Sequence, residues 1–475
     1  MVDFSLAHFD ADVISFTLAR FEGDAEFAAT HFQGSHESTV TNFASAVFSK
    51  KANFANSDIE SPANFTLASF LGEASFTSVS FSGTDLNRPD FEGAEFREKA
   101  NFSFVRFQHY RVNFSSVVFF EDVAFRGTTF DGGSNFVGVT FNGHIDFSSS
   151  YFGGSAHFNP RASSDDHSIK PTSFMRRANF DSAIFNKEVN FNGALFHQSI
   201  SFRGASFLGD TDFSDATFNS DAIFASATFA SYLRFSGEHN PAVFREESVI
   251  NLEHAVVKKP EHISFHALRL RPSWLINVDV RRFELIDIDW GKQSVADEIE
   301  RLYERQKLSP HRPLSIAYRG LAVNAEENHR YEEASKFRYV AMEARRLESW
   351  RGFAPWRLSW WYWLASGYGE RVWQAFFVLL GILLLSALLY NHVGFARWEP
   401  KVASESDVIV AKRDDIGAPL KFSRSLTYSA GVMILQKPEP RPATTAAQTV
   451  VLLETILGPV QAALLALAIR RKFMR

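Results

Sequence analysis

Along the first half of the chain, large apolar residues recur at alternating steps of five and six positions, with small or polar residues between them. Phenylalanine fills most of these positions, as at Phe180, Phe185 and Phe191. Ile59 and Leu86 replace it within the same rhythm, so the position requires bulk and apolarity. The residue two places earlier is usually Ala, Val or Ile, and the residue directly before is usually polar. The repeating unit is therefore eleven residues long.

An eleven-residue period could also describe a helical supercoil. Two phenylalanines five residues apart would then lie about 140° apart around the helix axis, because an α-helix has 3.6 residues per turn. They could not share one packed seam. The Gly, Asn, Ser, Thr and Asp residues between them are also poor residues for a helix interior. Large, polar and small residues in alternation instead favour short extended segments joined by turns, which bury their apolar side chains only when stacked.

The segments ANFDSAIFNKEVNFNGALF (178–196) and ANFTLASF (63–70) resemble pentapeptide repeats in their Phe-centred form. This resemblance implies a right-handed, quadrilateral β-helix (a solenoid), with the central residue and the small residue before it pointing inward. Four sides give 22 residues per coil, and stacking at about 4.8 Å gives a rod of roughly 50 Å over residues 4–244. We therefore expect a mainly β protein, with the pentapeptide-repeat β-helix over residues 1–250 and an extension or cap over residues 251–292.

The repeat region is acidic. Residues 1–250 contain 30 Asp and Glu against 17 Lys and Arg, whereas the remaining residues contain 24 acidic and 32 basic ones. This asymmetry predicts two different environments, and an acidic wall disfavours nucleic-acid binding. The segment 159–173 interrupts the pattern but keeps the count, since Phe158 to Phe174 is 5+6+5. We expect a loop that bulges from a continuous register and is the place on the rod where a protein partner would bind.

Beyond Trp290 the pattern changes to helical spacing of Ala, Glu and Arg, which predicts an α-helical connector over residues 293–350. Within it, Asn328 and His329 predict a turn between two antiparallel helices. The stretch from Asn328 to Arg346 resembles a single helix-turn-helix unit of the tetratricopeptide kind. One copy favours a stiff adaptor over a peptide-binding groove.

Two apolar runs follow. Residues 372–390 are 19 residues without a charge, and residues 449–469 are 21 residues whose single charge is Glu454. Each run is long enough to cross about 30 Å of hydrocarbon. The aromatic segment 351–371 before them predicts an interfacial helix, because Trp and Tyr favour the headgroup level. Residues 372–475 are thus expected to form a two-span membrane domain.

The basic residues predict the orientation of this domain. They flank the two runs on their outer sides, at Arg345, Arg346, Arg351, Arg357 and Arg371 before the first and Arg470, Arg471, Lys472 and Arg475 after the second. The positive-inside rule then predicts a two-pass protein of the inner (plasma) membrane of a bacterial cell, with both termini and the repeat rod in the cytoplasm. The beginning of the chain has no secretory-signal pattern, and the absence of cysteine is compatible with the cytoplasm.

The segments SRSLTYSAG (423–431) and LLETILGPVQAALLALAIRRKF (452–473) resemble the pore helix and the inner helix of two-transmembrane, potassium-channel-like proteins. This resemblance implies a re-entrant segment between the two spans. The chain departs from it at the selectivity filter, where Ser429 is followed by AGVMILQ with a single glycine. Potassium selectivity requires a glycine-containing loop of the TVGYG type, so it is not supported. The triplet 367–369 (GYG) precedes the first span and does not replace the filter.

The candidate pore or gate residues are Tyr428, Ser429, Gly431, Glu454, Gly458 and Pro459. A carboxylate within a span usually faces a pore, a partner or a wet cavity, which makes Glu454 the strongest candidate. The alternative is that Glu454 only fixes packing, paired with Tyr428 or Arg424. Gly458 and Pro459 predict either a hinge or a static kink. Tyr428 and Ser429 would line or brace a pore loop.

Three functions are compatible with these patterns. The first is a channel-like membrane protein that conducts ions, with poor selectivity, under the control of a cytoplasmic sensing or docking rod. Such a pore requires a homo-oligomer, such as a tetramer. The second is a non-conducting membrane-anchored scaffold, whose partners are membrane lipid and a protein bound to the acidic rod. The third, implied by resemblance to soluble pentapeptide-repeat proteins, is a DNA mimic that binds topoisomerases. We expect no enzyme activity, catalytic residue, cofactor or metal, because no motif for them occurs and His262 and His266 fit surface positions on a strand.

Overall fold

The computed structural model forms two compact units, Met1–Ser294 and Val295–Arg475. The described residues are 1–11, 13–34, 40–82, 89–108, 111–162, 169–239, 243–245, 248–291, 294–306, 309–348, 355–393, 395 and 421–473. Parts of three predicted features lie outside them, namely Leu86 of the repeat, the middle of the loop 159–173, and most of the segment between the two apolar runs. Arg351 and Arg475, used for the orientation, also lie outside them.

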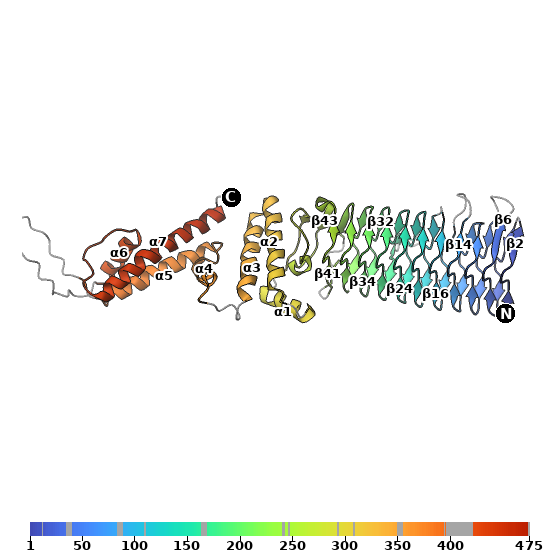
Figure 1. Ribbon diagram of the computed structural model, residues 1–475, viewed down its shortest axis with the longest axis horizontal. Coiled ribbons are helices and arrows are strands. Elements are labelled where there is room, and N and C mark those ends of the chain that lie inside the picture. Colours follow the sequence, from blue (N-terminus) through green and yellow to red (C-terminus); the bar gives the residue numbers. More distant parts are fainter. Residues whose placement is uncertain are drawn as a thin grey trace, which may run out of the picture. The chain divides into compact units, whose positions relative to one another are not determined.

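The first unit is a four-sided solenoid of parallel strands, most of them two residues long (Figure 1). One face runs from β1 (Val2–Asp3) to β41 (Ile250–Asn251), and the next runs from β2 (His8–Ala11) to β42 (Val256–Val257). The other faces run from β3 (Ile14–Ser15) to β44 (Glu284–Ile286), through bridges at Asp90, and from β4 (Arg20–Phe21) to β37 (Thr217–Phe218). The predicted β-solenoid is confirmed.

Stacked phenylalanine rings form the core of the solenoid. Phe180 is fully buried, and its ring stacks on Phe147 of the preceding coil at 4.8 Å and on Phe202 of the following coil at 5.0 Å between centroids. The small residue two places earlier also points inward, since Ala178 is buried and pairs with Ile200, 22 residues later. The predicted coil length and both inward positions are therefore confirmed for uninterrupted coils.

The corners that follow many of the phenylalanines turn through the left-handed region. Ser182, Gly204 and Ser226, each two residues after a phenylalanine, have φ values of 59°, 65° and 59°. This conformation costs a residue with a Cβ atom roughly 1–2 kcal/mol, so glycine is favoured there. Many corners are not glycine, and the stacked phenylalanine rings before and after each corner stabilise its left-handed conformation.

The loop predicted at 159–173 contains a β-hairpin. β27 (Arg161–Ala162) and β28 (Ile169–Lys170) pair in antiparallel fashion. The register continues across this insertion, because the ring of Phe174 stacks on that of Phe141, 33 residues earlier, at 5.0 Å. This coil thus has eleven residues more than the 22-residue coils, and the predicted bulge from a continuous register is confirmed.

The end of the solenoid differs from the repeats. β43 (Ile263–His266) and β44 continue the third face, and Trp274, in the short 3-10 helix η2 (Pro272–Leu275), packs edge-on against Phe244. Trp274 is buried, so a large indole covers the end of the phenylalanine stack at this corner.

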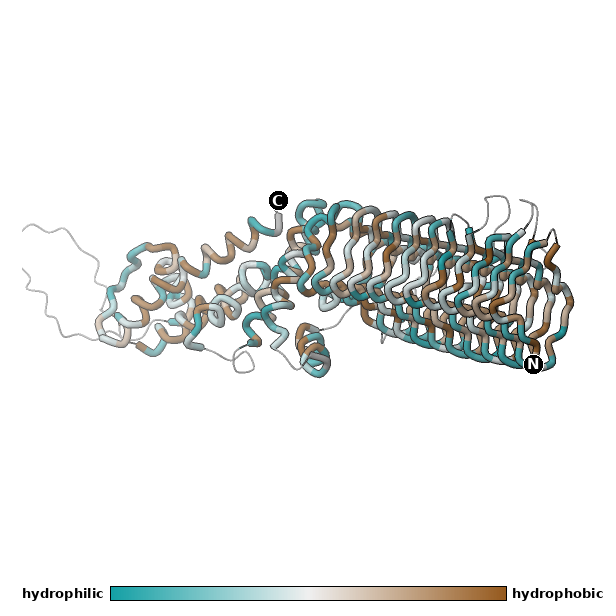
Figure 2. Tube along the Cα trace, turned by 45° about the vertical axis from the view of Figure 1, so that its right-hand side comes forward, coloured by the Kyte–Doolittle hydropathy of each residue, from teal (hydrophilic) through white to brown (hydrophobic). Residues whose placement is uncertain are grey.

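The second unit is helical. Its helices are α1 (Val295–Gln306), α2 (His311–Glu327), α3 (Tyr331–Leu347), α4 (Leu358–Ser366), α5 (Val372–Tyr390), α6 (Phe422–Met433) and α7 (Thr445–Phe473). The predicted turn at Asn328 and His329 separates α2 from α3. α5 begins and ends at the predicted residues, and α7 contains the second apolar run. Both are long and apolar enough to cross a membrane, and Figure 2 shows hydrophobic stretches along this part of the chain.

Candidate functional site

The carboxylate of Glu454 lies at the centre of the bundle of α5, α6 and α7. Its residue is only 2% exposed. The hydroxyl of Tyr390, at the end of α5, donates a hydrogen bond of 2.5 Å to Oε2 of Glu454. The hydroxyl of Ser429, on α6, donates to Oε1. Both carboxylate oxygens therefore have partners within the same chain.

Aromatic rings cover the Tyr390 side of this centre. The ring centroids of Tyr390 and Tyr428 lie 5.0 Å apart, and those of Phe395 and Tyr428 also lie 5.0 Å apart. Val432 completes this buried cluster. The sequence had suggested Tyr428 or Arg424 as the partner of Glu454. Tyr428 instead packs against the ring of Tyr390, and it is Tyr390 that donates the hydrogen bond.

The two candidate glycines lie at close contacts. A Cβ atom on Gly458 would lie 3.0 Å from Cγ of Met433, at the end of α6, and one on Gly431 would lie 3.3 Å from Cγ of Pro438. Gly458 allows α7 to pack closely against the end of α6. Gly431 allows the segment at Pro438 to pack closely against α6. α7 runs as one continuous helix through Gly458 and Pro459. The structure thus brings Tyr428, Ser429 and Glu454 together and gives Gly458 a packing role beside them.

A tight turn joins α4 to α5. Gly367, Tyr368 and Gly369 all have positive φ values, of 53°, 62° and 76°. Tyr368 is buried, and its hydroxyl donates to Glu343 of α3 over 3.5 Å. Burial, together with the charge of Glu343, raises the pKa of Tyr368. The GYG triplet is therefore a turn whose tyrosine packs against the connector helices.

A second buried carboxylate lies directly after this turn. The side chain of Glu370 is 6% exposed. It accepts a 2.5 Å hydrogen bond from Ser335 of α3, and its Oε1 lies 3.2 Å from Nη1 of Arg471, near the end of α7. Nε of Arg338, on α3, lies 3.7 Å from the same oxygen. Glu370 thus links the connector to both apolar helices. Glu370 was not predicted as a functional residue, since its signal in the sequence is a lone acid between a glycine turn and an apolar run.

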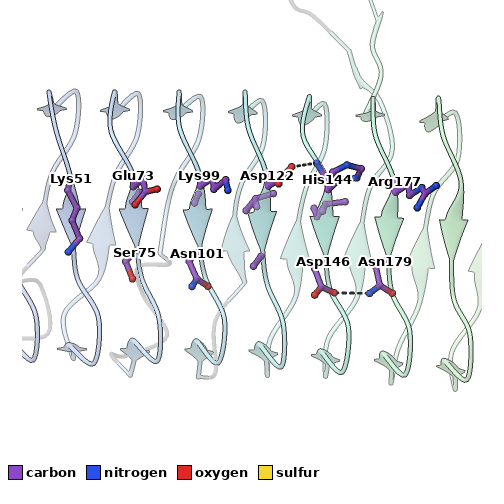
Figure 3. Close-up of a pocket in the computed structure, with 15 residues that line it drawn as sticks. Lys51, Glu73, Ser75, Lys99, Asn101, Asp122, His144, Asp146, Arg177 and Asn179 are labelled. Atoms are coloured by element: carbon purple, nitrogen blue, oxygen red, sulfur yellow. Dashed lines mark hydrogen bonds between the residues drawn. The ribbon is translucent and has the colours of Figure 1, made fainter.

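On the solenoid, a shallow groove follows the first face (Figure 3). It has a volume of about 650 Å³, and charges of alternating sign line it at Lys51, Glu73, Lys99, Asp122 and Arg177. Neighbouring coils satisfy one another here, since the backbone N–H of His144 donates to Asp122 over 2.8 Å. The lining of this groove therefore carries charges of both signs.

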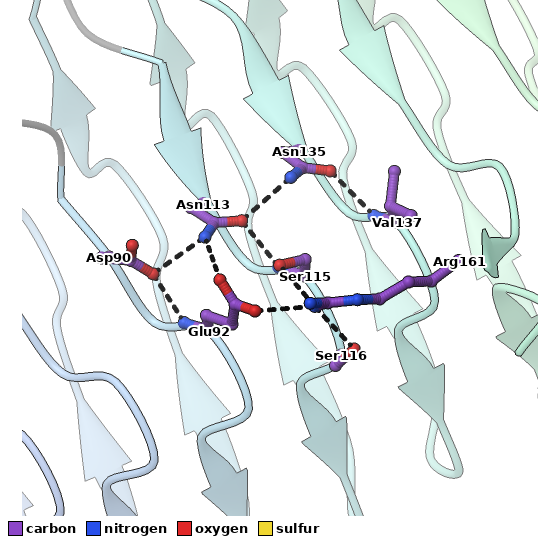
Figure 4. Close-up of polar contacts among 8 residues, drawn as sticks. All are labelled: Asp90, Glu92, Asn113, Ser115, Ser116, Asn135, Val137 and Arg161. Carbon is purple, nitrogen blue, oxygen red and sulfur yellow. Dashed lines mark hydrogen bonds and ion pairs between the residues drawn. The ribbon is translucent and has the colours of Figure 1, made fainter. Parts of the chain in front are cut away.

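The hairpin of β27 and β28 is fastened to the third face by one arginine (Figure 4). Nη1 of Arg161 lies 2.8 Å from Oε1 of Glu92 and donates to the hydroxyls of Ser115 and Ser116 over 3.3 and 3.1 Å. Asn113 donates to the other oxygen of Glu92 over 3.1 Å. The side chain of Arg161 thus contacts residues of earlier coils, and these contacts fix the base of the hairpin. Residues 163–168, between β27 and β28 in the sequence, lie outside the described residues.

A histidine and two carboxylates meet on the second face. Nδ1 of His31 lies 3.6 Å from Oδ2 of Asp58, and Nε2 lies 3.7 Å from Oε1 of Glu60. One ligand atom from each residue lies within 4.8 Å of the others, so the group could hold a divalent cation such as Zn²⁺. The two nitrogens of His31 face different carboxylates, so the ring bridges Asp58 and Glu60. Sequence reasoning missed this group because His31 and Asp58 meet only through strand pairing.

Comparison with known proteins gave one family match. Residues 191–239 match the family model described as pentapeptide repeats (9 copies). No curated protein and no solved structure matches the chain. The matched residues lie within the four-sided solenoid and include the stacked rings of Phe202 and Phe224. The chain therefore contains pentapeptide repeats, folded as a β-solenoid and followed by a helical unit with two long apolar helices.

Proposed function

We propose that this protein is a membrane-anchored interaction scaffold, in which α5 and α7 cross the bilayer and the solenoid displays a surface for a protein partner. The observation that carries this proposal is the environment of Glu454. A carboxylate that lines a conducting pore would face water or the ion. Both oxygens of Glu454 instead accept hydrogen bonds from hydroxyls of the same chain, as expected for a carboxylate that fastens helices together.

The exposed surfaces of the helices support the membrane part of the proposal. Large apolar side chains point outward along both helices, with Phe377 and Leu385 61% exposed on α5 and Leu452 62% exposed on α7. In water such a surface would be unfavourable, whereas lipid tails cover it without cost. Arg371 before α5 and Arg470 near the end of α7 then favour a cytoplasmic location for the solenoid under the positive-inside rule.

Alkaline washing of membranes tests the anchor. The full chain should remain in the membrane pellet at high pH, and the double variant Leu380→Arg/Leu384→Arg should move into the supernatant or be degraded. Each arginine costs about 2.5–3.5 kcal/mol at the centre of a span. The matched variant Leu380→Ile/Leu384→Ile should stay in the pellet. Release of the unaltered chain by the wash would reject the anchor.

A channel-like function is a second candidate, and α6 is the observation that favours it. This helix has 12 residues, or about 18 Å, too short to cross the bilayer, and it packs against both α5 and α7. A short helix held between two spans is the arrangement implied by the pore-module resemblance. Ion flux in liposomes from a verified oligomer, altered by Glu454→Ala, would favour the channel. A verified oligomer without flux would favour the scaffold.

A further inference from the structure

Three neighbouring strands on the second face of the solenoid carry side chains with metal-ligand atoms at their outward positions. These strands are β2, β6 (His31–Gly34) and β10 (Asp58–Ile59), and the first two are labelled in Figure 1. The outward positions carry His8 and Asp10, His31 and Gln33, and Asp58 and Glu60. On the next two coils the same positions carry Ser80 and Ser82, then Arg106 and Gln108. Imidazole and carboxylate groups therefore gather on three adjacent coils.

The spacing of the ligand atoms fits a metal ion better than a set of hydrogen bonds. The separations of 3.6 Å from His31 to Asp58 and 3.7 Å from His31 to Glu60 exceed the length of an N–H···O hydrogen bond, about 2.7–3.2 Å. They are close to the distance of about 3.4 Å between two ligands of a tetrahedral zinc ion, whose bonds are about 2.0–2.1 Å long. One ligand atom from each residue lies within 4.8 Å of the other two, so one nitrogen of His31 can share an ion with both carboxylates.

The carboxylate of Asp58 is oriented by a residue of the following coil. The hydroxyl of Ser82 donates to Oδ1 of Asp58 over 3.3 Å, and the other oxygen, Oδ2, faces His31. Carboxylates that bind metal ions are commonly held by such hydrogen bonds. The side chains of His31, Asp58 and Glu60 are 28%, 44% and 41% exposed. An ion can therefore reach them from solvent, and both carboxylates have room to rotate toward it.

A second imidazole lies beside this group. The ring of His8 stacks on that of His31 with 4.7 Å between centroids. His8 is exposed, and its side chain forms no hydrogen bond or ion pair with any described residue. A stacked ring lies above the plane of its neighbour, so His8 must turn about its side-chain bonds to reach an ion held by His31. Its exposure permits this rotation, which completes a set of four nitrogen and oxygen ligands.

We propose that His31, Asp58 and Glu60, with His8 as the fourth ligand, bind a divalent transition-metal ion, for which Zn²⁺ is the best match. Imidazole ligands favour Zn²⁺, whereas Mg²⁺ and Ca²⁺ prefer sets made of oxygen alone. The ion connects three neighbouring coils, because its ligands come from β2, β6 and the coil of β10. The inference goes beyond the scaffold function, since the site requires neither a membrane nor a partner.

Calorimetric titration of the detergent-solubilised full chain with zinc chloride tests the site. The chain is purified without a histidine tag and treated with a chelator, which is then removed. One Zn²⁺ per chain should bind at least tenfold more tightly than Mg²⁺ or Ca²⁺. Zn²⁺ should also raise the melting temperature of the β-sheet signal in circular dichroism, because an ion that binds the folded state stabilises it.

Variants connect the signal to the four ligands. His31→Gln and Asp58→Asn should each weaken Zn²⁺ binding at least tenfold and abolish the thermal shift, and His8→Ala should weaken binding at least threefold. His144→Ala, an exposed histidine on the first face, is the matched control and should change nothing. Melting curves without Zn²⁺ show that each variant folds. Zn²⁺ binding that persists unchanged in both the His31 and Asp58 variants belongs to other surface groups and overturns the proposal. A loss of stability in these variants that is equal with and without Zn²⁺ assigns the residues to an ion pair alone and also overturns it.

Discussion

Removing the carboxylate of Glu454 should destabilise the helical unit through the hydroxyls that it holds. Glu454→Ala leaves the hydroxyl of Tyr390 buried inside the bundle without its acceptor, whereas the hydroxyl of Ser429 still has the carbonyl of Leu383 as an acceptor at 3.1 Å. An unsatisfied buried hydroxyl costs about 1–3 kcal/mol, so the expected loss from Tyr390 is about 1–3 kcal/mol, to which the lost volume of the Glu454 side chain adds. Glu454→Gln keeps an acceptor and the volume of the side chain, and should cost about 1–2 kcal/mol. This order of effects follows from hydrogen bonding and does not depend on conduction.

A double-mutant cycle isolates the contact between Glu454 and Tyr390. If the hydroxyl of Tyr390 binds the carboxylate, Tyr390→Phe should cost clearly less in the Glu454→Ala background than in the unaltered chain. The coupling energy should be about 1–3 kcal/mol, as for other directly bonded pairs. Seven of the nine tryptophans lie beyond residue 294, so intrinsic fluorescence mainly reports unfolding of the helical unit. Unfolding of the detergent-solubilised chain by sodium dodecyl sulfate would provide the free energies.

Thr455→Ala is the matched control for this cycle. Its hydroxyl bonds to the carbonyl of Val451 within α7, and its removal should cost less than about 1 kcal/mol. A coupling energy below about 0.5 kcal/mol between Glu454 and Tyr390 would refute the hydrogen bond between them, because residues that do not interact show coupling energies of that size. The carboxylate would then have to face water or another chain, and the pore interpretation would become the stronger one.

Three further predictions concern the rest of the chain. Phe180→Ala should cost the solenoid about 3–5 kcal/mol, because it leaves a cavity in the ring stack, and a smaller shift in chemical denaturation followed by circular dichroism would contradict this. Gly204→Ala should cost about 1–2 kcal/mol from its left-handed corner, whereas Ser226→Ala at an equivalent φ should be nearly neutral in the same assay. Burial, together with the charge of Glu298, raises the pKa of Tyr318, so its stabilising effect is present below about pH 10 and is lost as pH rises further, by up to about 1.4 kcal/mol per pH unit. Tyr318→Phe should make that alkaline loss shallower in melts at pH 9–11, and an unchanged slope would contradict the assignment.

The solenoid could be predicted from sequence because each of its units repeats the same local requirement. A large residue, as at Phe180, and a small residue two places earlier, as at Ala178, recur along the repeat. Both become buried when the coils stack. The span of α5 was predictable for a similar reason, since its apolar run ends at charged or polar residues on both sides. α7 exceeds its apolar run at both ends, because polar residues such as Thr445 and Arg470 continue the helix without continuing the hydrophobicity.

The polar centres could be predicted only in part. Glu454 was recognisable as a charge within an apolar run, but its donor Tyr390 is 64 residues away and follows no periodic rule. Glu370 and Arg471 are separated by 101 residues. Such contacts depend on how helices turn and pack, and a single sequence has no signal for this beyond the rarity of the charge itself. The hairpin carrying Arg161 was likewise predicted as a loop, without its anchor on Glu92.

Glu454 lies on α7, and Glu370 contacts Arg471 of the same helix, which sets a limit on how these two buried carboxylates could communicate. Glu454 lies near the middle of α7 and Arg471 near its end, so 17 residues, or about 26 Å of helix, separate them. A ligand that altered the contact of Glu370 with Arg471 would leave the hydroxyls around Glu454 with their partners. A ligand can shift an equilibrium only by its difference in affinity for two states. Binding would therefore act on the bundle only through movement of α7 as a whole, and the close contact of Gly458 with Met433 opposes sliding of α7 past α6.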